Sequence, residues 1–255
     1  MTAPVAVVSG GSSGIGLATV QELLAQGYRV AFFGQQAERV DEARQLLARA
    51  HATAQIHAGT VDLRDADAVR AFFAGVATRW EAPAALVCNA GFSPKRPEGG
   101  RAPLAEIALA EWNDVLAVNL TGALLCCQGV LPTMAARGFG RIVLIGSVAG
   151  RGMPRIAGAS YVASKSALVG LARSIVAEYS RHGITANTVC PGRIATEMAG
   201  PPDSPANRAA LERIPAGRLG APHDVARVVA FLLRPDSGFV NGAVVDVNGG
   251  ELTPP

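Results

Sequence analysis

This chain of 255 residues lacks the signals of several large protein classes. Its four cysteines form no C-x-x-C pair and lie in apolar runs, and its four histidines have no metal-ligand spacing. No uninterrupted apolar run reaches the ~18 residues that cross a bilayer, and no basic segment followed by an apolar one precedes the first predicted strand. The sequence therefore predicts no metal site, no membrane partner and no export, so the expected location is the cytoplasm.

The chain also has no large excess of positive or negative charge. The formal net charge is +3, and the basic residues are scattered rather than gathered in a stripe that would fit a phosphate backbone. The densest basic segment, Lys95 to Arg101, also contains proline and glycine and is best explained as a solvated loop. No nucleic-acid partner is expected. The chain is instead rich in apolar residues, at 49%, and in glycine, which indicates a compact core with many tight turns.

Short apolar runs alternate with longer stretches of helical period along the chain. The predicted strands are Val5–Ser9, Arg29–Phe33, Ala54–Ala58, Ala84–Asn89, Arg141–Ser147, Ile184–Cys190 and Val240–Val247. The predicted helices are Ile15–Gln26, Ala37–Ala50, Asp65–Arg79, Glu111–Ala136, Ser160–Arg181 and Pro222–Leu233. Strands rich in Val, Ile and Ala, without polar alternation, are typical of a parallel sheet buried on both faces.

This alternation predicts one α/β domain over residues 1–255. It would be a Rossmann-type, doubly wound parallel sheet of about seven strands with helices on both faces. Ligands of such sheets bind beyond the carboxyl ends of the strands, so the residues that follow each strand are the candidates for a functional site.

A glycine-rich turn follows the first predicted strand and opens the first predicted helix. Glycine allows a tight turn and lets backbone N–H groups approach a pyrophosphate, which the start of a helix also attracts. The spacing is G-x-x-x-G-x-G, and no G-x-x-x-x-G-K-[S/T] loop of an ATPase occurs. The turn therefore predicts dinucleotide binding by Gly10, Ser12, Ser13, Gly14, Ile15 and Gly16.

The end of the second strand normally selects the dinucleotide. An acidic residue there hydrogen-bonds the ribose 2′-OH of NAD and repels the 2′-phosphate of NADP. Here the chain has Gln35 and no carboxylate until Glu38, while Arg39 follows directly. The sequence favours NADP(H), with Arg39 near the phosphate, and NAD(H) remains possible.

Tyr161 and Lys165 lie four residues apart on a predicted helix, so their side chains share one face. A nearby ammonium favours the phenolate and is expected to lower the pKa of the tyrosine. The phenol could then donate a proton to a carbonyl oxygen as hydride reaches the carbon, or accept one in reverse. Arginine supplies 21 of the 23 basic residues, so a lysine here indicates selection for compactness or pKa.

Ser147 ends a predicted strand at the same edge of the sheet. A hydroxyl there can hydrogen-bond the reacting oxygen and stabilise developing negative charge, although a serine at the end of a strand is also common in turns. No G-x-S-x-G segment occurs, which argues against a serine hydrolase.

Taken together, these motifs resemble the short-chain dehydrogenase/reductase family over essentially the whole chain. Further segments match the family pattern. Asp62-Leu63 match a pair that lies near the adenine in the family, and Asn89-Ala90-Gly91 match a segment in which Cys88 replaces the family's first Asn. Asn119 also matches, as do Pro191-Gly192, Ile194 and Thr196, which in the family pack against the nicotinamide. The resemblance implies that Tyr161 exchanges the proton, Ser147 orients the substrate oxygen, Lys165 holds the ribose and Asn119 supports a proton relay.

The resemblance also implies a substrate lid at about 193–213, a homotetramer, and a small carbonyl or alcohol substrate. We expect an NADPH-dependent ketoreductase, such as a 3-oxoacyl thioester reductase. The alternatives are an NAD-dependent dehydrogenase of a sugar, polyol, steroid or cyclic alcohol and, more remotely, a non-catalytic nucleotide sensor. Ala177 stands where reductases of acyl-carrier-protein substrates place a docking arginine, which weakens that particular substrate.

Overall fold

The fold is a seven-stranded sheet with the strand order β3-β2-β1-β4-β5-β6-β7, and every neighbouring pair is parallel. The computed structural model describes residues 3–96 and 100–253, so residues 97–99 of the basic segment and both chain ends lie outside it. The strands are β1 (Val5–Ser9), β2 (Arg29–Gly34), β3 (Ile56–Thr60), β4 (Ala85–Cys88), β5 (Gly140–Ile145), β6 (Ile184–Pro191) and β7 (Val244–Val247). The predicted doubly wound parallel sheet is confirmed.

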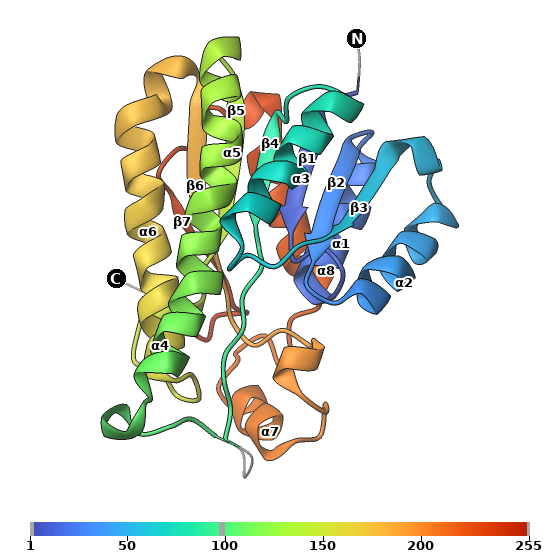
Figure 1. The fold of residues 1–255 in the computed structure, drawn as a ribbon. Coiled ribbons are helices and arrows are strands. Elements are labelled where there is room, and N and C mark those ends of the chain that lie inside the picture. Colours follow the sequence, from blue (N-terminus) through green and yellow to red (C-terminus); the bar gives the residue numbers. More distant parts are fainter. Residues whose placement is uncertain (1–2, 97–99, 254–255) are drawn as a thin grey trace.

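Helices cover both faces of the sheet (Figure 1). One face carries α1 (Gly14–Ala25), α2 (Ala37–Ala48) and α8 (Pro222–Leu233). The other face carries α3 (Ala66–Arg79), α5 (Gly122–Arg137) and α6 (Ala159–Tyr179), with α4 (Leu109–Leu116) leading into α5. The short helix α7 (Pro205–Leu211) lies away from the sheet, beyond its carboxyl edge (Figure 1).

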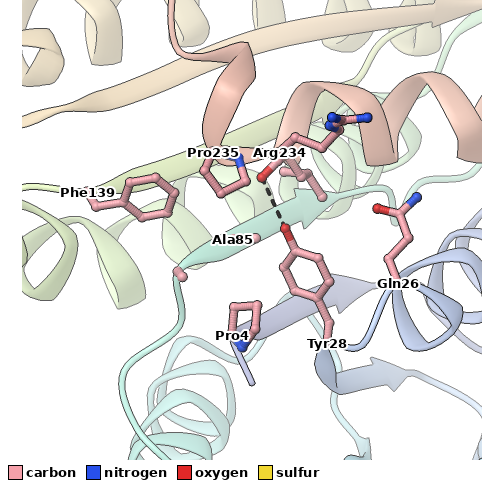
Figure 2. Close-up of a pocket in the computed structure, with 9 residues that line it drawn as sticks. Pro4, Gln26, Tyr28, Ala85, Phe139, Arg234 and Pro235 are labelled. Atoms are coloured by element: carbon pink, nitrogen blue, oxygen red, sulfur yellow. Dashed lines mark hydrogen bonds between the residues drawn. The ribbon is translucent and has the colours of Figure 1, made fainter. Parts of the chain in front are cut away.

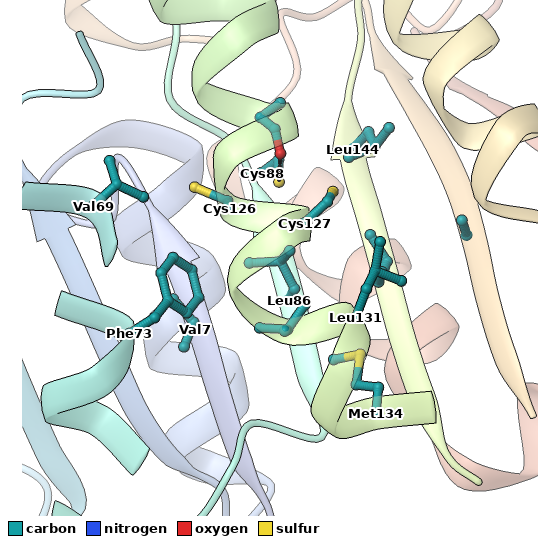
Figure 3. Close-up of a cluster of buried hydrophobic side chains, with 14 of the residues drawn as sticks. Val7, Val69, Phe73, Leu86, Cys88, Cys126, Cys127, Leu131, Met134 and Leu144 are labelled. Atoms are coloured by element: carbon teal, nitrogen blue, oxygen red, sulfur yellow. Dashed lines mark hydrogen bonds between the residues drawn. The ribbon is translucent and has the colours of Figure 1, made fainter. Parts of the chain in front are cut away.

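The central strand β1 shows why the strand pattern is continuously apolar. Val5 and Val7 belong to the core on the α5 side, whereas Ala6 and Val8 belong to the core on the α1 side, and all four are fully buried. Alternate side chains of a strand point to opposite faces, so two-sided burial requires an apolar residue at every position. On the α5 side, Figure 3 shows side chains of β1, β4 and α5 packed together, with Cys88, Cys126 and Cys127 among them.

The last strand begins later than predicted. It starts at Val244 rather than Val240, because Gly242 has a positive φ of 75° that interrupts the extended chain. The Asn187 side chain bridges this interruption: its amide donates to the Val240 carbonyl at 2.8 Å and its oxygen accepts from the Ala243 N–H at 2.9 Å.

The predicted helix Glu111–Ala136 is two α-helices joined by one π-helical turn at Ala117–Thr121. Within the described residues, the combined helix Leu109–Arg137 has the length and the apolar composition of a membrane-spanning helix. The sequence did not predict this, because polar residues interrupt the apolar run. The same helix packs on the sheet, where Cys126, Val130 and Met134 are buried in the core.

A small cavity of about 260 Å³ lies at the amino edge of the sheet (Figure 2). Pro4 and Ala85, at the starts of β1 and β4, line it together with Tyr28, whose hydroxyl donates to the Leu233 carbonyl at 3.1 Å. It is therefore on the opposite edge from the strand ends where parallel sheets bind ligands.

The four buried cysteines give a first prediction. Hydrogen bonding to Cys126 and burial raise the pKa of Cys88 well above its usual range, and burial raises the pKa of Cys190 to about 11. Only thiolates react readily, so we expect the native protein to react very slowly with Ellman's reagent at pH 8, and the urea-unfolded chain to release four equivalents quickly. If the native protein rapidly released one equivalent of the coloured product, one thiol would be accessible to the reagent.

Candidate active site

A cavity of about 1010 Å³ opens at the carboxyl edge of the sheet. Residues that follow several strands line it, which is where the sequence placed the functional site. The predicted site residues on its wall are Gly10, Ser12, Ser13, Gly14, Ile15, Gln35, Asp62, Leu63, Asn89, Ala90, Gly91, Ser147, Tyr161, Lys165, Pro191, Gly192, Ile194 and Thr196. The two predicted residues that do not line it are Gly16 and Asn119, which lie behind the wall.

The glycine turn has a backbone conformation that favours glycine. Gly10 and Gly14 have positive φ values of 65° and 52°, which residues with side chains rarely adopt. Gly16 does not line the cavity, and a Cβ there would stand 2.0 Å from the Gly10 carbonyl oxygen. Gly16 therefore lets α1 approach the turn closely rather than facing the cavity.

Ser9 and Asn89 fasten this turn to the end of β4. The Ser9 hydroxyl oxygen accepts from the N–H groups of Asn89 at 3.1 Å and Ala90 at 3.2 Å. In return, the Asn89 side-chain amide donates to the carbonyls of Ser9 at 3.2 Å and Gly10 at 3.0 Å. The hydroxyl of Ser9 therefore links the turn after β1 to the chain that follows β4.

The segment after β6 closes the cavity from the other side. Gly192 donates its N–H to the Val247 carbonyl at 2.9 Å, and a Cβ at Gly192 would stand 2.8 Å from the Cβ of Asn248. Farther along, the methyl group of Thr196 lies 3.2 Å from the position that a Cβ on Gly14 would occupy. The predicted Pro191–Thr196 segment and the glycine turn therefore face each other across the site.

Polar and charged side chains line the end of the cavity near β2. Gln35 donates to the Asp62 carboxylate at 3.1 Å, and Asp62 also accepts from Arg64. Arg39 forms an ion pair with Glu197 at 2.5 Å. No carboxylate from positions 35 to 37 is available for a ribose hydroxyl, as the sequence indicated.

Lys165 lines the cavity and is almost fully buried. Its ammonium donates to the Ile145 carbonyl at 2.8 Å and stands 5.8 Å from the centroid of the Tyr161 ring, so the two side chains share one face of α6 as expected. A Cβ at Gly91 would lie 3.0 Å from the Lys165 Nζ and 3.1 Å from the Asn119 Oδ1. Only glycine at position 91 leaves this space to the ammonium and the amide.

Asn119 lies in the π-helical turn and is 1% exposed. Its amide donates to the Phe92 carbonyl and to the Ser164 hydroxyl, both at 3.0 Å, and its oxygen accepts from the Phe92 N–H at 3.0 Å. Ser164 donates onward to the Tyr161 carbonyl at 2.7 Å. Wide helical turns of this kind are frequent at functional sites. Sequence reasoning missed the turn and Ser164, because a serine inside a helix carries no special signal.

The pKa values differ from the sequence expectation. Burial raises the pKa of Tyr161, and a hydrogen bond with Ser147 opposes the rise. Burial also lowers the pKa of Lys165 to about 8. The expectation that the ammonium lowers the pKa of the phenol is therefore wrong for the protein alone, because the loss of hydration on burial is the largest influence on Tyr161 and outweighs the hydrogen bond with Ser147. The phenol is protonated at neutral pH.

The predicted lid segment is built around two side chains that sequence reasoning did not single out. The Arg193 guanidinium donates to the Asn207 side-chain oxygen and to the Ala199 carbonyl, both at 2.7 Å. The buried Asn207 amide donates in turn to the Pro201 carbonyl at 2.6 Å. These bonds join the loop after β6 to α7, and no local sequence pattern predicts them.

A doubly wound sheet whose cavity joins a glycine turn to a tyrosine–lysine pair defines an oxidoreductase of the dinucleotide-binding class. A family model described as enoyl-(acyl carrier protein) reductase matches residues 10–251. The chain belongs to the short-chain dehydrogenase/reductase family.

Two relatives illustrate the range of the family. The 3-oxoacyl-[acyl-carrier-protein] reductase MabA of Mycobacterium tuberculosis is 37% identical over 245 residues, which cover 96% of this chain and 91% of the relative. The cis-4-hydroxycyclohexanecarboxylate dehydrogenase of Sinomonas cyclohexanicum is 37% identical over 249 residues, which cover 96% and 95%.

Two solved structures superpose closely on the fold. A blue fluorescent protein from a metagenomic library, in complex with NADPH, has a TM-score of 0.87 at 31% identity and covers 98% of both chains. A 3-oxoacyl-[acyl-carrier protein] reductase from Brucella melitensis with bound NAD has a TM-score of 0.88 at 32% identity, covering 98% of this chain and 92% of the other.

The buried ammonium gives a prediction about stability and pH. The pKa of Lys165 is about 8 in the folded protein and near the usual 10.5 in the unfolded chain. Between these values the unfolded chain binds more protons at this site, so the contribution of Lys165 to stability rises with pH, by at most about 1.4 kcal/mol per pH unit.

We expect the unfolding free energy of wild type minus that of Lys165→Met, both measured by urea denaturation, to increase from pH 8 to pH 10. Methionine binds no proton in either state, so the difference isolates this site. Lys95→Met, which removes the other lysine of the chain, is the matched control. A difference that is flat or decreasing over this range would contradict the lowered pKa of Lys165.

Proposed function

We propose that this oxidoreductase is an NADPH-dependent ketoreductase, and that 3-oxoacyl thioesters are its substrate class. The observation that carries the proposal is the meeting of Ser147, Tyr161 and Lys165 on one cavity wall with the glycine turn. The activity of MabA, a relative over nearly the whole chain, supports the substrate class. On this proposal the chain is a single domain with its substrate lid at about 193–213.

The bound nicotinamide supplies the hydride in such a reaction. Tyr161, protonated because burial raises its pKa, donates its phenolic proton to the carbonyl oxygen, so hydride and proton together convert the ketone to an alcohol. Ser147 hydrogen-bonds the same oxygen and stabilises its developing charge. Lys165 holds the ribose and stabilises the phenolate that remains, and Asn119 is a positioning residue that fixes the chain around Phe92.

The coenzyme lies, on this proposal, along the predicted binding residues from the glycine turn to Thr196. NADP(H) is favoured because Gln35 is neutral and Arg39 supplies a cation nearby. Phe92, Met153 and Ile156 also line the cavity, and their apolar side chains would suit a hydrocarbon substrate.

The second candidate is an NAD-dependent dehydrogenase of a cyclic alcohol. The observation in its favour is the equal identity to cis-4-hydroxycyclohexanecarboxylate dehydrogenase, together with the NAD complex among the structural neighbours. A screen of initial rates decides between the two. Faster reduction of 3-oxoacyl esters with NADPH than with NADH supports the ketoreductase, whereas a preference for NADH above tenfold contradicts it.

Tyr161→Phe tests the mechanism. We expect kcat for ketone reduction to fall at least ~100-fold, because the proton donor is lost, while coenzyme binding measured by fluorescence stays within about twofold. Tyr179→Phe, at the end of the same helix and away from the cavity, is the control. Turnover that survives in Tyr161→Phe would exclude the phenol as the proton donor, and wild type that binds coenzyme without reducing any ketone would favour a nucleotide sensor.

We also propose a cytoplasmic homotetramer without a nucleic-acid or membrane partner. Light scattering coupled to gel filtration tests the assembly, since the 26.1 kDa chain gives a tetramer of about four times that mass. A monomeric mass at micromolar concentration would contradict this part of the proposal.

A further inference from the structure

One ion pair connects the coenzyme end of the cavity to the lid. Arg39 lies in the first turn of α2, and Glu197 follows Thr196 at the start of the predicted lid. Their side chains meet at 2.5 Å although 158 residues separate them, and both line the large cavity. The pair therefore bridges two walls that a dinucleotide would have to pass between.

Arg39 is the cation best placed for a 2′-phosphate. None of positions 35 to 38 is basic, and position 13 in the glycine turn is a serine. Arg64 also lines this part of the cavity, but two carboxylates, those of Asp62 and Asp114, already bind its guanidinium. Arg39 has one acidic partner among the described residues, so it is the guanidinium with capacity for a further anion.

The Arg39–Glu197 pair is also easy to displace. The two side chains are 44% and 72% exposed, and ion pairs between solvated side chains contribute little to stability. A phosphate monoester carries more negative charge than a carboxylate and offers three acceptor oxygens, so it binds a guanidinium more strongly. A 2′-phosphate near Arg39 would therefore compete successfully with Glu197.

We propose that Glu197 is a specificity-determining residue, which masks Arg39 and which the 2′-phosphate of NADP(H) must displace. This inference rests on the proposed function, because it concerns the same coenzyme site. NADH carries no 2′-phosphate and leaves the pair intact, so NADPH alone bears the cost of breaking it. Glu197 thus reduces the preference for NADPH that Arg39 creates.

The test is a double-mutant cycle on coenzyme affinity, with no turnover needed. Dissociation constants of NADPH and NADH are measured by coenzyme fluorescence at constant ionic strength for wild type, Arg39→Gln, Glu197→Gln and the double variant. We expect Glu197→Gln to raise the ratio of NADPH to NADH affinity about two- to fivefold, the range for an exposed pair. Arg39→Gln lowers the ratio at least ~tenfold, because a charged hydrogen bond is lost.

The double variant separates masking from simple repulsion. If Glu197 acts through Arg39, adding Glu197→Gln to the Arg39→Gln variant leaves the ratio of NADPH to NADH affinity almost unchanged. The change is then no larger than the change that the control Glu212→Gln causes in wild type. Glu212 is the matched control, an exposed acid of the lid segment that does not line the cavity. An equal gain from Glu197→Gln in both backgrounds would overturn the proposal, since Glu197 would then repel the phosphate directly.

The outcomes also distinguish this inference from the proposed function. Wild type that binds neither coenzyme would contradict both. Wild type that binds both coenzymes, with a ratio that neither Arg39→Gln nor Glu197→Gln changes, would overturn the masking role alone and leave the ketoreductase proposal standing.

Discussion

Helices cover both faces of the sheet, α1, α2 and α8 on one side and α3, α5 and α6 on the other, and the edge strands β3 and β7 are its least buried parts. The central strands of such a sheet bury mostly apolar side chains, and the strand ends are where ligands bind. Seven parallel strands end at one edge, so residues as far apart in sequence as Gly10, Ser147 and Gly192 reach the same cavity. The small cavity near Tyr28 lies at the opposite edge, where the strands begin.

Burial also determines the chemistry of the site. Lys165 is a cation with almost no contact with water, and its hydrogen bond to the Ile145 carbonyl partly replaces the lost hydration. The same loss of hydration lowers the pKa of the ammonium and raises that of the Tyr161 phenol. Each group is therefore held nearer its neutral form, and the developing charges of a reaction would be stabilised by neighbours instead of by solvent.

The two sides of the cavity are held together in different ways. The turns after β1 and β4 are joined by four hydrogen bonds of 3.0 to 3.2 Å between Ser9, Gly10, Asn89 and Ala90, residues that are 79 to 81 positions apart in the sequence. The segment 193–213 is held internally by Arg193 and Asn207. It contacts the rest of the protein through the solvated Arg39–Glu197 pair, through buried contacts of Ile194 and through a hydrogen bond from the Ala195 N–H to the Gly220 carbonyl at 2.8 Å.

The sequence by itself determined the strands, most helices, the glycine turn and the spacing of Tyr161 and Lys165, because these follow from local periodicity and backbone conformation. Tertiary structure decided the π-helical turn at Asn119, the packing role of Gly16, and the partner of Arg39. It also decided the pKa of Tyr161, where the sequence expectation failed. Each of these depends on groups that are distant in sequence and on how much water the fold removes, and neither quantity can be read from a local pattern.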